Sequence, residues 1–170
     1  SLLLTFYVPN VRADSTFGNE NTYDDFTGIG GAGLLSGRFQ LTENGTVTKI
    51  TARLKTTSGT KNCKAAIYND SAGEPNDLQG YSGEVAVSSE ADYNFTVNIG
   101  LSAGWYHLTI FLYDSTCYMS YVAASGTSDY ANLAYDGFPD TYPTHQNSVG
   151  LLSIYATYTP SGGEEKNFYG

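Results

Sequence analysis

The stretch that decides the fold is YNFTVNIGLSAGWYHLTIFLY, residues 93–113. In its first half, apolar or aromatic residues alternate with polar ones, which places Tyr93, Phe95, Val97 and Ile99 on one face of a strand. Its second half alternates in the same way. One face carries Tyr106, Leu108, Ile110 and Leu112, and the opposite face carries Trp105, His107, Thr109, Phe111 and Tyr113. The glycines between the halves indicate a turn, so the stretch predicts two successive β-strands.

The same period of two recurs along the chain, at residues 46–56, 63–68, 116–122 and 151–159. Within residues 46–56, Val47 is out of phase with Ile50, Ala52 and Leu54, which predicts a β-bulge. Clusters of Gly, Asn, Asp, Ser and Pro separate these runs, and no helical spacing continues beyond two turns. Many short strands without helices predict an all-β sandwich of two antiparallel sheets.

Composition narrows the functional classes. The chain has 170 residues, of which only 15% are charged, with 15 Tyr and 19 Gly, a balance typical of extracellular all-β proteins. Its formal net charge of -9 argues against nucleic acid as a partner, because phosphate binding requires clustered Lys and Arg. The same charge argues against docking on an anionic membrane, and we expect no membrane insertion.

The order of several motifs resembles a family of jelly-roll modules found in secreted and surface proteins of archaea, bacteria and their viruses. The motifs are SGRFQLTENGTVTKITARL (36–54), KAAIYNDSAGEPNDL (64–78), NIGLSAGWYHLTIFL (98–112), GFPDTYP (137–143) and LLSIYATYT (151–159). This resemblance covers about residues 16–159 and implies a jelly-roll fold. It implies no catalytic residues, because such modules serve as sugar binders, surface modules and parts of appendages.

The residues suggest no enzyme. The only histidines, His107 and His145, stand in no hydrolase motif, and two separated Cys with two separated His do not give the local pairing of a zinc site. GIGGAG (28–33) precedes a strand rather than a helix, so we interpret it as a turn and not as a phosphate loop. We therefore expect a non-catalytic protein without a cofactor.

Calcium is the one metal that the loops suggest. Carboxylates gather at Asp24 and Asp25, and again at Asp70 and Asp77, and Ca²⁺ takes six to eight oxygen ligands. Tight turns use the same residue types without any ion, so these four are weak candidates.

Aromatic residues give a lead on binding. Trp105, Phe111 and Tyr113 share a strand face, and flat aromatic side chains on a β-sandwich can stack on glycans. The alternatives are that these rings belong to the core, or that they contact a neighbouring subunit.

Two further features suit a secreted glycoprotein. Cys63 and Cys117 lie in strand-like stretches and could meet across the core, either as a disulfide or as two buried thiols. The sequons at Asn44, Asn69 and Asn94 are candidate N-glycosylation sites.

The first residues, SLLLTFYVPNVRA (1–13), allow two interpretations. They resemble the end of a signal peptide, with Val11-Arg12-Ala13 as the cleavage motif. They also suit a strand arm of the mature protein, because the run is rich in β-formers and Pro9 ends it. We favour the arm, which divides the chain into an arm (1–13), a jelly-roll β-sandwich (14–160) and a tail (161–170).

An apolar strand of this kind must be buried, either in its own sheet or in that of a second copy. Donation to the next copy, as in donor-strand complementation, would build a head-to-tail homopolymer. The predicted contact residues are Leu2, Leu3, Leu4, Phe6, Tyr7 and Val8. The sequence thus predicts a structural subunit of an extracellular filament or cell-surface assembly, and the alternative is a carbohydrate-binding module that uses the aromatics around Trp105.

Overall fold

The structure, a computed structural model, describes residues 12–162, and it gives the backbone but not the side chains of residues 124–127 and 149. All regular structure in this range is β, and every strand pairing is antiparallel. The twelve strands are β1 (Ser15–Gly18), β2 (Phe26–Thr27), β3 (Gly33–Leu41), β4 (Gly45–Thr56), β5 (Lys61–Ser71), β6 (Glu74–Tyr81), β7 (Val85–Val87), β8 (Ala91–Leu101), β9 (Gly104–Leu112), β10 (Cys117–Asn132), β11 (Gln146–Leu152) and β12 (Ile154–Pro160). Within residues 12–162 we find no helix that is long and apolar enough to cross a membrane.

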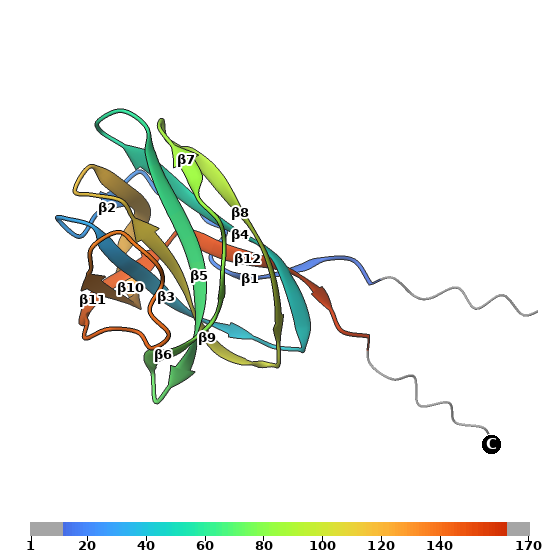
Figure 1. The fold of residues 1–170 in the computed structure, drawn as a ribbon. Helices are drawn as coiled ribbons and strands as arrows, with labels where there is room; N and C mark the ends of the chain where they lie inside the picture. The colour runs from blue at the N-terminus through green and yellow to red at the C-terminus, as the bar shows by residue number, and fades with distance from the viewer. Residues whose placement is uncertain (1–11, 163–170) are drawn as a thin grey trace, which may run out of the picture.

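The strands form two sheets that pack against each other (Figure 1). In the first, which we call the β4 sheet, the order is β1-β12-β4-β8, with β2 and the start of β10 placed beside the far end of β4. In the second, the β9 sheet, the order is β11-β10-β3-β9-β5-β6, and β7 pairs with the start of β5. Strand β10 belongs to both, because it pairs with β4 at Cys117–Met119 and with β3 at Ser128–Asn132. The all-β fold with two antiparallel sheets is therefore confirmed.

The hydrophobic core lies between the two sheets and follows the predicted alternation. From β8 and β9 it takes Phe95, Val97, Ile99, Tyr106, Leu108, Ile110 and Leu112. Facing residues such as Ile50, Leu54 and Ile154 come from β4 and β12. The predicted bulge in β4 is also confirmed, because its pairing with β8 shifts register between Val47 and Lys49. The core thus arises from apolar residues at every second position of long strands.

The described parts of the chain begin and end side by side. Ser15 of β1 pairs with Tyr158 of β12, and the Thr159 hydroxyl donates a hydrogen bond of 2.7 Å to the Asp14 carboxylate. Figure 1 shows these ends on the opposite side of the sandwich from β2 and β11. This separation gives the molecule two distinct ends.

Candidate functional site

The outer face of the β9 sheet is covered by the segment 133–145, which joins β10 to β11. Backbone hydrogen bonds fix this segment along β6, from Leu78 N to Asp140 O (2.8 Å) and from Tyr142 N to Asn76 O (2.7 Å). The Tyr142 hydroxyl also lies 2.7 Å from the Ser36 hydroxyl of β3. A second hydrophobic cluster forms beneath the segment, from Leu34, Ala66, Tyr68, Phe111, Ala131 and Tyr142. Both faces of the β9 sheet are therefore buried over much of their area.

This cover corrects one expectation about the aromatic residues. Phe111 is fully buried, because Tyr135 and Phe138 pack on it with ring centroids 4.9 and 5.4 Å away. A buried ring cannot stack on a glycan. Phe111 belongs to a core, which was one of the alternatives for these aromatics.

Trp105 and Tyr113 remain accessible, each with 42% of its surface exposed. They lie at opposite ends of β9, with the buried Phe111 between them, so they do not form one continuous platform. The Arg38 guanidinium covers one side of the Trp105 ring, 4.1 Å from the ring centroid. Trp105 beside Arg38 and Tyr113 beside Lys61 therefore remain two separate candidates for glycan contact.

A row of ionisable side chains begins at Arg38 and runs beneath the edge of the segment 133–145. Arg38 Nε donates a hydrogen bond of 2.6 Å to Asp70 Oδ1, and the same oxygen lies 2.9 Å from His107 Nε2. The Arg38 hydrogen bond is the largest cause that lowers the pKa of Asp70 to about 2, with His107 and the Gly73 N–H assisting. Asp70 is thus ionised at any pH near neutrality.

The row of side chains continues inward through His107 to Asp129. His107 is fully buried, and its Nδ1 lies 3.3 Å from Asp129 Oδ2 without the geometry of a hydrogen bond. The Asp129 side chain is itself only 3% exposed. These positions follow from register, because Asp129 of β10 pairs with Ser36 of β3, and Ser36 pairs with Thr109 of β9, two residues from His107.

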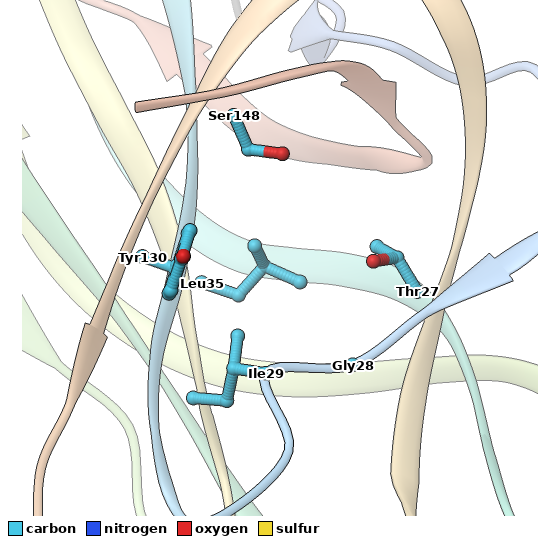
Figure 2. A pocket seen from close by; sticks show the side chains of 6 residues that line it. All are labelled: Thr27, Gly28, Ile29, Leu35, Tyr130 and Ser148. Carbon is cyan, nitrogen blue, oxygen red and sulfur yellow. The ribbon is translucent and has the colours of Figure 1, made fainter. Parts of the chain in front are cut away.

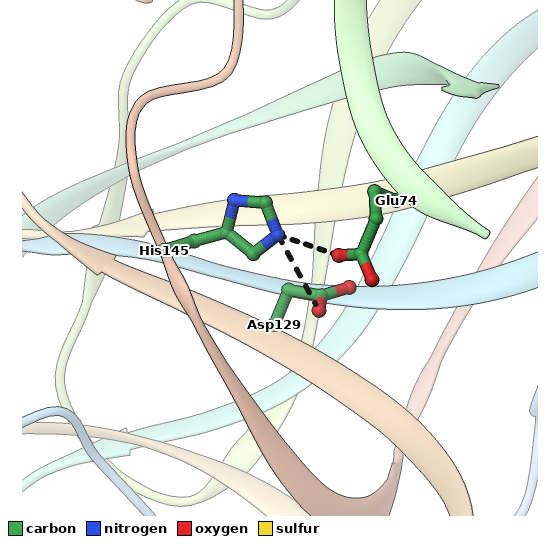
Figure 3. A group of neighbouring side chains, drawn as sticks. All are labelled: Glu74, Asp129 and His145. Atoms are coloured by element: carbon green, nitrogen blue, oxygen red, sulfur yellow. Dashed lines mark hydrogen bonds and ion pairs between the residues drawn. The ribbon is translucent and has the colours of Figure 1, made fainter. Parts of the chain in front are cut away.

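At the far end of this row of side chains, His145 lies beside both Glu74 and Asp129 (Figure 3). His145 Nε2 lies 2.7 Å from Glu74 Oε2 and 4.0 Å from Asp129 Oδ1. Burial opposes protonation of His145, but the Glu74 hydrogen bond, the Pro143 carbonyl and the Asp129 charge raise its pKa. The His145 hydrogen bond lowers the pKa of Glu74 in turn.

Sequence reasoning missed this group of residues. The sequence analysis found both histidines outside any motif. The reason is that the side chains of this group come from five strands and one loop, which are far apart in the sequence. One signal was present: His107 shares a strand face with Phe111, where a buried histidine needs polar partners. Nothing local in the sequence indicates which residues those partners are.

Calcium binding at Asp24, Asp25, Asp70 and Asp77 remains a prediction. Among the described residues, none of the four belongs to a group of three or more nearby metal-binding side chains. The Asp70 carboxylate already accepts hydrogen bonds from Arg38 and from the Gly73 N–H.

The predicted thiols and sequons lie as follows. Cys63 and Cys117 are both buried free thiols, and the neighbouring Cys117 together with burial raises the pKa of Cys63. Asn44 and Asn94 are exposed, whereas Asn69 is partly buried and accepts a hydrogen bond of 2.7 Å from the Asp77 N–H. The disulfide and the glycosylation remain predictions.

The predicted contact residues Leu2, Leu3, Leu4, Phe6, Tyr7 and Val8 lie outside the described residues, as does most of the predicted tail. Arg12, where the description begins, forms an ion pair of 2.8 Å with Glu43. Residues 1–11 are therefore attached at the end of the sandwich where β1 begins and β12 ends.

The opposite end of the sandwich has a pocket of about 270 Å³ with a mixed polar and apolar lining (Figure 2). Six residues line it: Thr27, Gly28, Ile29, Leu35, Tyr130 and Ser148. Leu35 belongs to the main core, and Ile29 and Tyr130 pack against that core, so the pocket reaches into the sandwich. Beside it, β2 and β11 each pair as strands only with β10 in the described part of the chain.

In comparisons with known proteins, no family model, no curated protein and no solved structure matches this chain.

Proposed function

We propose that this chain is a non-catalytic, secreted structural subunit that polymerises head-to-tail in an extracellular filament or cell-surface assembly. Its partner is the next copy of itself, which receives residues 2–8 as a donated strand. One observation carries the proposal: the described chain begins at the end of the sandwich opposite to β2 and β11, strands whose residues Thr27 and Ser148 line the pocket (Figure 1).

The fold within this proposal is a jelly roll with additional strands. The orders β1-β12-β4-β8 and β3-β9-β5-β6 support it, because successive strands of these eight alternate between the two sheets, except β5 and β6, which pair as a hairpin. Strands β2, β10 and β11 extend the sandwich at one end, and the pocket lies among them. The receiving site therefore belongs to the part added to the jelly roll.

The length of β12 gives the distance between the two ends of the sandwich. Its first residue follows Ser153, whose N–H donates to the Ser120 carbonyl beside β2, whereas Tyr158 near its last residue pairs with Ser15. Seven residues at about 3.3 Å each span roughly 20 Å. A segment leaving one end cannot enter its own pocket without crossing the sandwich, so a second copy is the simpler recipient.

The pocket has room for one side chain of such a segment, and Ile29 and Leu35 give it apolar contacts. A cavity of about 150 Å³ holds a benzene ring, so 270 Å³ accommodates one large apolar side chain such as that of Phe6. The unpaired edges of β2 and β11 can hydrogen-bond to the donated backbone. Because the donor and acceptor surfaces differ and do not close on each other, the contact propagates as a filament.

The test uses two variants that each lose one half of the contact. One lacks residues 1–9, and the other carries Ser148→Trp, which fills the pocket; Ser148→Thr is the matched control. Electron microscopy should show filaments for the unmodified chain and the control, and none for either variant alone. A mixture of the two variants should give 1:1 pairs by light scattering, because one intact donor meets one intact acceptor.

Filaments formed by the chain without residues 1–9 would refute the donated strand. Filaments that persist with Ser148→Trp, but not without residues 1–9, would place the acceptor elsewhere.

A second candidate, carbohydrate binding, is favoured by the surroundings of Trp105. This exposed indole lies beside Arg38 and Asp70, so an aromatic surface adjoins charged hydrogen-bonding groups. Retention of the chain on a glycan column that is lost in Trp105→Ala but kept in Tyr113→Ala would support this candidate. Absence of retention across a broad glycan panel would exclude it.

A further inference from the structure

We propose that Glu74, Asp129 and His145 form a binding site for a divalent first-row transition-metal ion such as Zn²⁺. The site lies on the covered face of the β9 sheet and shares no residue with the pocket or with residues 1–11. The pocket is on the other face of β10, because its residue Tyr130 follows Asp129 directly and packs against the main core.

The three side chains converge closely enough to share one ion. One ligand atom from each lies within 4.8 Å of the other two, and Figure 3 shows the His145 ring directed toward both carboxylates. Zinc binds nitrogen and oxygen at about 2.0–2.2 Å, so tetrahedral ligand atoms stand about 3.3 Å apart. The Glu74–His145 distance of 2.7 Å must open and the Asp129–His145 distance of 4.0 Å must close, each by less than 1 Å.

The His145 ring is oriented as such a ligand needs. Its Nδ1 lies 3.1 Å from the Pro143 carbonyl oxygen, which can only accept a hydrogen bond. The Glu74 carboxylate also only accepts, so Nε2 donates to it in the metal-free structure. A metal ion would replace that Nε2 proton, while Nδ1 keeps its hydrogen bond to Pro143. A backbone carbonyl on the second nitrogen is the usual arrangement around a metal-binding histidine.

An independent observation comes from His107, which does not belong to the three ligands. It is fully buried, its Nδ1 has no hydrogen-bond partner, and this atom lies 3.3 Å from Asp129 Oδ2. Because His107 Nε2 faces the Asp70 carboxylate, His107 acts as a positioning residue between two acidic groups.

Asp129 is a buried carboxylate that faces two histidines. Within the described residues its only ion-pair partners are the two histidines, with no Lys or Arg among them. A buried carboxylate is costly unless a cation offsets its charge. An ion bound at Asp129 Oδ1 would supply that charge, while Oδ2 stays available to His107.

The donor set selects among metals. One imidazole with two carboxylates suits Zn²⁺, Co²⁺ and Ni²⁺, whereas Ca²⁺ and Mg²⁺ prefer oxygen donors alone. The ligands come from β6, β10 and the loop before β11, so the spacing rules for local zinc motifs could not detect them.

Isothermal titration calorimetry on the untagged full chain, stripped with a chelator, provides the test with Zn²⁺ as the probe. We expect one saturable site that Ca²⁺ does not occupy, and we expect Co²⁺ to give visible absorption bands. Glu74→Gln and His145→Gln should each weaken Zn²⁺ binding by about 10- to 100-fold or more. Glu84→Gln is the matched control, because Glu84 is an exposed carboxylate whose bonded partner is Asn62.

Two results would overturn the proposal: no saturable binding at millimolar Zn²⁺, or equal affinity in Glu74→Gln and Glu84→Gln. Zn²⁺ that binds through the buried thiols would give the second result, and Cys63→Ser would then remove it. Because Glu74 is half exposed, its substitution by Gln should leave the fold intact, which circular dichroism checks.

Discussion

Ala72 has a backbone φ of 56°, in the left-handed region that L-residues seldom occupy. With Gly73 at φ 98°, it forms the two-residue turn between β5 and β6. Both central residues of this turn have positive φ, which is the hairpin conformation that favours Asn-Gly. The turn also places Glu74, the first residue of β6, beside His145.

Substitution of this alanine tests the strain. Ala72→Asn should raise the free energy of unfolding by about 0.5–1 kcal/mol, because Asn tolerates the left-handed region better than Ala. Urea denaturation measures the change, with Ala72→Val as the control that should lower stability. A gain in both variants would show that backbone conformation is not the cause.

Asp70 makes stability depend on pH in the acid range. Its pKa falls from 3.8 to about 2 in the folded chain, so folding favours the ionised form. This contribution is complete above the unfolded pKa and is lost as pH falls through the folded value. About 2 kcal/mol should disappear between about pH 4 and pH 2.

Comparison with Asp70→Asn isolates this effect. The stability difference between the unmodified chain and the variant, measured by urea denaturation at several pH values, should shrink over that range. A difference that stays constant from pH 5 to about pH 2 would assign the role of Asp70 to packing.

At the scale of elements, the segment 133–145 determines which side chains on the outer face of β9 reach solvent. Phe111 and Trp105 occupy the same face of one strand, yet one is fully buried and the other is 42% exposed. The difference comes from Tyr135 and Phe138, which are more than 20 positions further along the chain.

Alanine substitutions at Phe111 and Trp105 should lower the free energy of unfolding by different amounts. Phe111→Ala should cost about 3–5 kcal/mol, because it removes a ring from a closed cluster, whereas exposed Trp105→Ala should cost about 1 kcal/mol or less. Thermal or urea unfolding gives both values. Equal small losses would mean that the segment does not pack on β9 in solution.

For the whole molecule, oxidation of the two thiols should change the stability of the sandwich. Cys63 starts the buried part of β5, Cys117 starts β10, and the two are neighbouring buried thiols. A disulfide here would close a long loop and should add about 4 kcal/mol to stability in the chain-entropy model. Mass spectrometry of the chain secreted into an oxidising medium should show the loss of two hydrogens, and a Cys63→Ser variant should lack the added stability.

Much of the fold could be predicted from sequence, because alternation is a local property. The phases of Phe95, Leu108 and Ile110 indicate strands with one inner face, and the phase change at Val47 indicates the bulge in β4. The outer face of β9 could not be predicted, since burial of Phe111 depends on a distant segment that resembles a surface turn.

The sequence by itself determined that this is an all-β protein with two antiparallel sheets, because a period of two encodes which side chains face inward wherever a strand forms. Only the tertiary structure decided which polar residues meet. Asp70, His107, Asp129 and His145 are brought together by strand register and by the covering segment, and no spacing along the chain records those contacts. Register depends on the packing of the entire core, so the charged network and the end pocket exist only after the sandwich has closed.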